Sequence, residues 1–125
     1  MKFVHVATRT KDLDRAIAFY EALGLRLGHK SELTKNKATL AFMTRPEGDF
    51  AIELVYNWGK DDGYDGGGRF GHFAFDVHDI GVEYARLVSA GGTEVGRAPA
   101  PLQGDGHRIA FVADPDGNWI ELIER

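Results

Sequence analysis

The chain has 125 residues, the length of one compact domain, and its 43% hydrophobic and 27% charged residues are ordinary for a folded protein. A net charge of -4 argues against a nucleic-acid binder, because phosphate contacts need clustered Lys and Arg. The absence of cysteine excludes a disulfide framework, a thiolate nucleophile and a Cys-rich zinc site, so any metal must be held by His and carboxylate side chains.

The first half of the chain is predicted to form a strand, a helix and three further strands. Residues 2–8 are an apolar, β-branched run with no long hydrophobic stretch, so we expect a strand rather than a signal peptide or membrane span, and a cytoplasmic location. Apolar residues then recur at helical spacing from Leu13 to Leu23 and stop at Gly24, which favours the end of a helix. Short strands are predicted near residues 25–30, 38–43 and 50–56, with a turn at 46–49 before the last.

The second half repeats this order after a linker. Residues 59–69 contain five glycines and three aspartates, and no helix follows them directly, so we interpret them as a linker and not a phosphate-binding loop. A strand around His72 and a helix from Ile80 to Val88 come next. Strands are then predicted near residues 93–97, 107–112 and 118–123.

The two halves are an internal repeat with an offset of 67 to 69 residues. An offset of 67 relates the starts of the halves, pairing Phe3, His5, Ala7, Asp12, Ala18 and Gly24 with Phe70, His72, Ala74, Asp79, Ala85 and Gly91. An offset of 69 pairs Ala41-Phe42 with Ala110-Phe111, and one of 68 pairs Ile52-Glu53-Leu54 with Ile120-Glu121-Leu122. We therefore predict an α+β fold of two βαβββ modules, at about 1–58 and 70–125, joined by the Gly-rich linker in a single domain.

Each module places a His in its first strand and a Glu in its last. His5 and Glu53 are 48 residues apart, and His72 and Glu121 are 49 apart. Two imidazoles and two carboxylates suit Ni, Co, Fe, Mn or Zn better than Ca or Mg. Strand alternation puts these four side chains opposite their apolar neighbours, on a face left free to form a cavity. A single His or Glu in a strand is usually structural, but four at matching positions predict curved mixed sheets around a metal site.

The other histidines and the phenylalanines are given structural interpretations. The histidines without such partners are expected at the surface: His29, His78 and His107. The phenylalanines are expected to pack in the core: Phe42, Phe73, Phe75 and Phe111. For Trp58 the sequence leaves both roles open, packing in the core and binding of substrate.

Two segments carry a resemblance to a known family. Residues 52–59, Ile-Glu-Leu-Val-Tyr-Asn-Trp-Gly, and 110–121, Ala-Phe-Val-Ala-Asp-Pro-Asp-Gly-Asn-Trp-Ile-Glu, resemble the fourth-strand and C-terminal motifs of glyoxalase I in the vicinal-oxygen-chelate superfamily. The Asp-Pro-Asp-Gly turn is common across the superfamily, whereas Asn-Trp-Gly after a ligand Glu is far more specific. The resemblance covers the whole chain and implies that the metal ligands are His5, Glu53, His72 and Glu121.

The resemblance also implies lactoylglutathione lyase activity. In this reaction the hemithioacetal of methylglyoxal and glutathione is isomerised by metal-assisted proton transfer through an enediolate. Glu121 is the expected principal base, although the repeat makes Glu53 an equal candidate. The chain lacks the extra segments that accompany zinc-active members, so the resemblance favours Ni or Co over Zn.

Four residues match positions that contact the substrate in the family. Arg9 and Asn57 match those that hold the γ-glutamyl end of glutathione, and strand alternation independently puts both on the ligand face. Trp119 matches a residue lining the site. Some members have an Arg four residues before the second His, where this chain has Gly68, so Arg69 is a candidate contact one place later.

The expected partner is a second copy of the chain. The resemblance implies a two-fold homodimer with shared active sites, and no nucleic-acid or membrane partner is expected. Two alternative functions stay open. A dioxygenase, epimerase or thiol transferase of the same superfamily would also use His and Glu, but a dioxygenase needs two His and one carboxylate, and four ligands weigh against it. A non-enzymatic small-molecule-binding protein of this fold would need no metal set.

Overall fold

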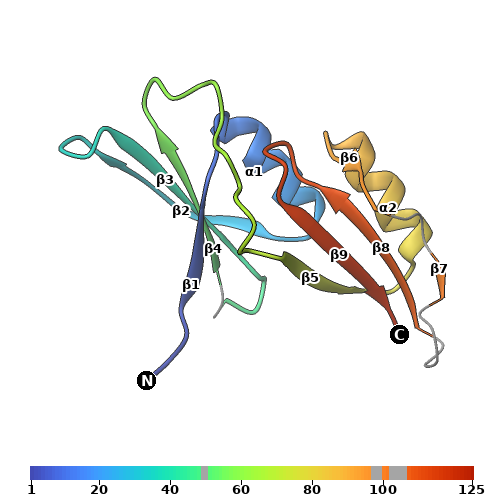
Figure 1. Ribbon diagram of the computed structural model, residues 1–125. Helices are drawn as coiled ribbons and strands as arrows, with labels where there is room; N and C mark the ends of the chain where they lie inside the picture. Colours follow the sequence, from blue (N-terminus) through green and yellow to red (C-terminus); the bar gives the residue numbers. More distant parts are fainter. Residues whose placement is uncertain (49–50, 97–99, 102–106) are drawn as a thin grey trace. The chain divides into compact units, whose positions relative to one another are not determined.

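The computed structural model describes residues 1–48, 51–96, 100–101 and 107–125. The chain divides into two compact units, Met1–Asp65 and Gly66–Arg125. Each unit combines one helix with one mixed sheet, so the predicted α+β class and its repeated strand-helix-strands order are confirmed (Figure 1).

The first unit is built on a four-stranded sheet of order β1-β4-β3-β2. Strand β1 (His5–Arg9) runs parallel to β4 (Ala51–Asn57). The other neighbours are antiparallel: β4 pairs with β3 (Ala38–Thr44), which pairs with β2 (Arg26–Leu33). Helix α1 (Leu13–Ala22) connects β1 to β2 and packs against β3 and β4.

The second unit repeats this plan with one difference. Strand β5 (His72–Val77) runs parallel to β9 (Trp119–Glu124), and β9 is antiparallel to β8 (Arg108–Ala113). Helix α2 (Ile80–Ser89) lies along β8 (Figure 1).

One strand was predicted near residues 93–97, and the structure has one short strand within this range and a second just beyond it. Both β6 (Thr93–Glu94) and β7 (Ala100–Pro101) pair with β8, so this sheet has five strands. Pro101 has no backbone N–H, which suits a short edge strand and not a long ladder. Arg97, the end of the predicted strand, and Asp49 and Phe50, in the predicted turn and strand of the first unit, lie outside the described residues.

Both helices are bounded by signals that the repeat preserves. The N-cap residues Asp12 and Asp79 accept hydrogen bonds from the backbone N–H groups of Arg15 and Val82, three residues on, at 3.2 and 3.1 Å. At the other end Gly24 has a φ of +91°, a conformation that glycine adopts without steric cost. In the described part of the chain no helix is long and apolar enough to cross a membrane.

The core of each unit lies between its helix and one face of its sheet. The largest side chains with less than 2% exposure in the first unit are Phe19, Tyr20, Met43, Ile52 and Leu54. Those in the second are Ile80, Leu87, Val112, Ile120 and Leu122. The alternation of strand side chains therefore directs the residues between them, Glu53 and Glu121 among them, to the opposite face of each sheet.

Candidate active site

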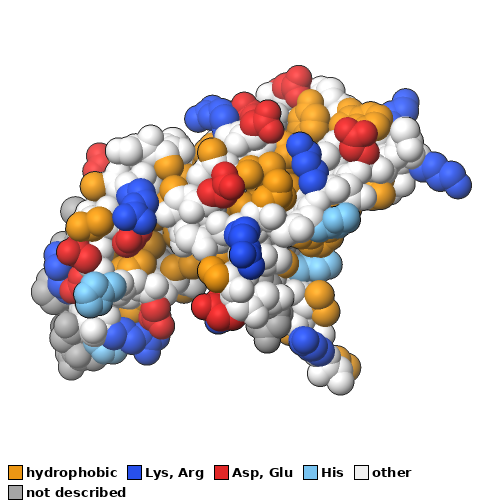
Figure 2. Space-filling model, turned by 180° about the vertical axis from the view of Figure 1, so that it is seen from behind, with side chains coloured by type: hydrophobic (Ala, Val, Ile, Leu, Met, Phe, Trp, Pro, Cys, Tyr) orange, Lys and Arg blue, Asp and Glu red, His pale blue; other side chains and the backbone are white. Residues whose placement is uncertain are grey.

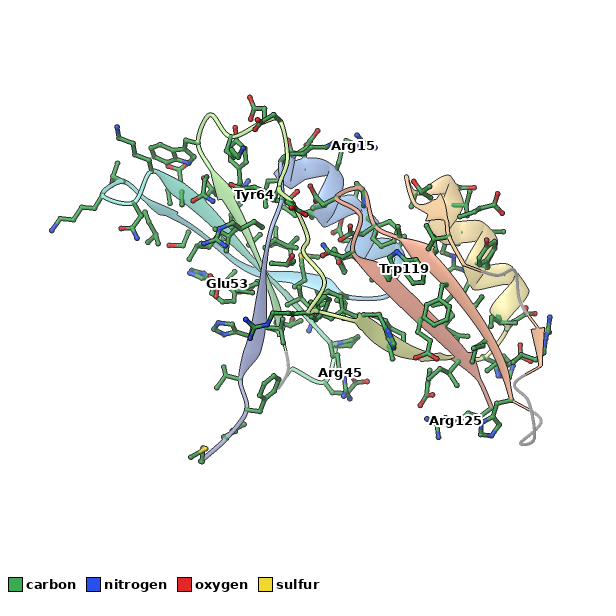
Figure 3. The ribbon with its side chains drawn as sticks, viewed as in Figure 1. Arg15, Arg45, Glu53, Tyr64, Trp119 and Arg125 are labelled. Carbon is green, nitrogen blue, oxygen red and sulfur yellow. The ribbon has the colours of Figure 1, made fainter. Side chains whose placement is uncertain are left out.

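The first unit brings His5 and Glu53 into contact. His5 Nε2 lies 2.8 Å from Glu53 Oε2, and the two side chains are 36% and 15% exposed. In the parallel ladder Ala7 faces Glu53, so His5 lies two residues away on the same face of β1. Figure 3 shows Glu53 on this face beside β1. The carboxylate is thus held between strands while still open to solvent.

The second unit repeats the same pair. His72 Nε2 lies 2.9 Å from Glu121 Oε2, with side-chain exposures of 39% and 18%. Ala74 faces Glu121 as Ala7 faces Glu53. The sequence repeat is therefore reproduced in side-chain geometry. Among the described residues of each unit, no group of three or more His, Cys, Asp or Glu side chains forms, so a unit by itself offers two such ligands.

The spacing within each pair fits neighbouring ligands of one cation. Two donor atoms about 2.1 Å from the same ion lie about 3.0 Å apart at an octahedral right angle and about 3.4 Å apart at a tetrahedral angle. The observed separations of 2.8 and 2.9 Å are those of hydrogen-bonded pairs, and they hold an imidazole nitrogen and a carboxylate oxygen close enough to bind one cation. An imidazole nitrogen and a carboxylate oxygen also form the borderline donor set expected for a divalent transition metal.

Two phenylalanines that we expected in the core lie on the ligand face instead. Phe42 meets His5 edge-on at 5.6 Å between ring centroids, and Phe111 meets His72 at 5.4 Å. The reason is the antiparallel register, which sets Phe42 opposite Glu53 and Phe111 opposite Glu121. Both are half-buried, and their matched repeat positions were the signal that could have revealed this role.

The other two phenylalanines and Trp58 have structural surroundings. Phe73 is 9% exposed, as expected for the core, and Phe75 is half-buried. The Trp58 indole N–H donates to Thr39 Oγ1 at 2.8 Å. Trp58 is therefore attached to β3, although 40% of it remains exposed.

Arg9 and Asn57 lie at the ends of β1 and β4 and converge on Tyr64. The Asn57 Nδ2 donates to Tyr64 Oη at 2.7 Å, and the Arg9 guanidinium carbon lies 6.0 Å from the Tyr64 ring centroid. Tyr64 belongs to the segment that we interpreted as a linker, and nothing in the repeat singled it out. A lone aromatic among glycines and aspartates was the only signal available.

The remaining predicted contacts lie in the second unit. Trp119 opens β9, is 41% exposed, and packs against Phe111 at 5.4 Å between ring centroids (Figure 3). Arg69 is exposed in the segment before β5. His107, expected at the surface, is half-buried.

The charged side chains are intermingled over the visible surface. Figure 2 shows acidic and basic groups side by side on that face. Several form exposed ion pairs, such as Lys60 with Asp62 at 2.7 Å, whose hydrogen bond raises the pKa of the Lys60 ammonium and lowers that of the Asp62 carboxyl.

Comparisons with known proteins agree on one family. The model of the Glyoxalase/Bleomycin resistance protein/Dioxygenase superfamily matches residues 2–122. Lactoylglutathione lyase of Haemophilus influenzae is 46% identical over 127 residues, covering 99% of this chain and 93% of that protein. A probable chloroplastic lactoylglutathione lyase of Arabidopsis thaliana is 44% identical, covering 99% of this chain and 36% of that protein.

A solved structure has the same fold. The crystal structure of glyoxalase I from Zea mays matches with a TM-score of 0.89 and 40% identity, over 99% of this chain and 44% of the maize chain. The chain therefore spans less than half the length of the two plant relatives and nearly all of the bacterial one.

Proposed function

Because the chain belongs to the Glyoxalase/Bleomycin resistance protein/Dioxygenase superfamily, we propose that it is a lactoylglutathione lyase, which isomerises the hemithioacetal of methylglyoxal and glutathione. The observation that carries the proposal is the repeated His/Glu pair with Nε2–Oε2 distances of 2.8 and 2.9 Å. Relatives named lactoylglutathione lyase, 46% identical in one case, support the choice of reaction.

The proposed metal ligands are His5, Glu53, His72 and Glu121. Each unit contributes one imidazole and one carboxylate, so both pairs together complete a four-ligand set. A bound divalent metal would supply Lewis-acid stabilisation of the negative charge that develops on the two adjacent substrate oxygens. We favour Ni or Co over Zn, because the extra segments of zinc-active members of the family are missing from this chain.

The proton is moved by a carboxylate of the chain. The hemithioacetal forms without an enzyme, so the protein must only take a proton from one carbon and return it to the next. Glu121 is the proposed principal base, and Glu53, with almost the same exposure of 15% against 18%, is its alternative. Phe42 and Phe111 line the same faces and would limit access of water to the intermediate.

The thiol is proposed to bind through its γ-glutamyl end. Arg9 would donate charge-assisted hydrogen bonds to a carboxylate, and Asn57 would contribute its side-chain oxygen as an acceptor. Both lie on the Glu53 face, at the ends of their strands. Trp119 and Arg69 are proposed to contact the rest of the substrate.

We further propose a homodimer in which His5 and Glu53 of one chain work with His72 and Glu121 of the other. The support is that each unit holds half of the ligand set. The cytoplasmic location expected from the sequence stays a prediction.

The test is an absorbance assay of thioester formation from methylglyoxal and glutathione. Chelated protein should be inactive, and Ni or Co should restore activity better than Zn. Full activity in metal-free protein would contradict the mechanism, and a clear preference for Zn would contradict the choice of metal. The metal content of the purified protein distinguishes a metal-dependent enzyme from a binding protein of this fold that holds no metal.

A further inference from the structure

Tyr64 is the point at which the two proposed thiol-binding residues meet. Its hydroxyl accepts from Asn57 Nδ2 at 2.7 Å, and its ring faces the Arg9 guanidinium at 6.0 Å. Tyr64 comes from the segment after β4, and Figure 3 labels it there. It is 38% exposed, so it remains accessible to a ligand while making both contacts.

These contacts restrict how the two binding residues can point. With one amide N–H directed at Tyr64, the Asn57 side chain is oriented and its Oδ1 is left to accept from a ligand. A cation within about 6 Å of an aromatic face is attracted by the ring quadrupole, so the Tyr64 ring favours one position of the otherwise flexible Arg9. Lys60 lies 5.4 Å from the same ring, but its ammonium is paired with Asp62 at 2.7 Å.

The equivalent positions in the second unit are arranged differently. The offsets of 67 and 68 carry Arg9 to Asp76 and Asn57 to Arg125. Arg125 Nε and Asp76 Oδ1 form an ion pair at 2.9 Å, so the Asp76 carboxylate neutralises the charge of this arginine. The first unit instead presents a cation against an aromatic ring, and within the described part of the chain no carboxylate pairs with Arg9. A guanidinium of this kind is better suited to receive an external carboxylate.

We propose that Tyr64 is a positioning residue for the thiol, holding Arg9 and Asn57 in the geometry that receives an α-amino-acid end. The cation matches the carboxylate of such a group, and the Asn57 oxygen matches its ammonium. This inference rests on the proposed function and extends it to a residue outside the two strands.

The test compares two tyrosines of the same region in the metal-reconstituted protein. In Tyr64→Phe, which keeps the ring and removes the hydroxyl, KM for the hemithioacetal should rise about three- to tenfold with kcat unchanged. The dissociation constant of S-methylglutathione, a non-reacting probe measured by calorimetry, should rise by the same factor. Tyr56→Phe is the matched control, because the Tyr56 hydroxyl donates to Asp61 at 2.6 Å and also accepts from the Gly59 amide, and its loss should leave both constants unchanged.

A double-mutant cycle separates positioning from a general effect on folding. If Tyr64 acts through Asn57, then Tyr64→Phe should add nothing to the KM of Asn57→Ala, whereas independent effects multiply. Multiplying effects, an unchanged KM in Tyr64→Phe, a loss confined to kcat, or an equal loss in Tyr56→Phe would each overturn the inference. An inactive wild-type protein would instead contradict the proposed function, so the two failures are distinguishable.

Discussion

Replacing Asp114 should destabilise the protein more than replacing Arg45, which holds the matching turn position in the first unit. Asp114 is 2% exposed in the turn between β8 and β9. Its Oδ1 accepts from the backbone N–H groups of Asp116 at 2.9 Å and Asn118 at 2.8 Å, and its Oδ2 accepts from Asn118 Nδ2 at 2.8 Å. The carboxylate therefore closes the turn that leads into β9, the strand of Trp119 and Glu121.

The size of the effect follows from these three bonds. A hydrogen bond to a charged group contributes about 1.5–3 kcal/mol, but the turn is partly open, so water would replace some of what Asp114→Ala removes. We expect the free energy of unfolding to fall by about 3 kcal/mol, which for a chain of this size lowers Tm by about 12 °C. Asp114→Asn keeps one acceptor oxygen but turns an amide toward Asn118 Nδ2, and should cost about half as much.

The control is Arg45, which the offset of 69 places at the same turn position in the first unit. Its ion pair with Glu47 is exposed, with side-chain exposures of 54% and 65%, and such pairs contribute at most about 1 kcal/mol. Thermal unfolding followed by circular dichroism measures all three variants. Equal losses for Arg45→Ala and Asp114→Ala, or a loss below about 1 kcal/mol for Asp114→Ala, would refute the reasoning.

Three further predictions concern substrate binding, assembly and the core. Arg9→Ala should raise KM by the equivalent of about 1.5–3 kcal/mol in steady-state kinetics, and an unchanged KM with glutathione would place the thiol elsewhere. Glu53→Ala and Glu121→Ala are each expected to be inactive alone. When the two variants are refolded together, roughly a quarter of wild-type activity should return, because about half the dimers are mixed and each mixed dimer holds one intact site. No recovery of activity in mixed dimers verified by mass would rule out shared sites. Leu122→Ala, at a side chain with 0% exposure, should lower the free energy of unfolding by about 3 kcal/mol in urea titration, and a loss under about 1 kcal/mol would show that the site had repacked.

Much of the candidate site could be predicted because it depends on local periodicity. Side chains two apart on a strand share a face whatever lies around them, so the alternation around Glu53 and Glu121 was enough to separate both from the buried isoleucines and leucines. The repeat also matched Asp12 with Asp79, but their role as helix N-caps was seen only in the structure. The repeat itself predicted that each His would accompany a Glu.

Only the tertiary structure decided which side chains come to lie beside these residues. The faces of Phe42 and Phe111 depend on how β3 and β8 pair with their neighbours, and a change of register by one residue reverses a face. The path of the glycine-rich segment has no periodicity at all, because glycine accepts many backbone conformations, so the sequence of that segment could not place the Tyr64 ring against Arg9 and its hydroxyl on Asn57. The sequence alone thus determined the two His/Glu pairs and their strands. The contacts of Phe42 and Phe111, which depend on strand register, and those of Tyr64, which depend on the path of the glycine-rich segment, were decided only by the folded chain.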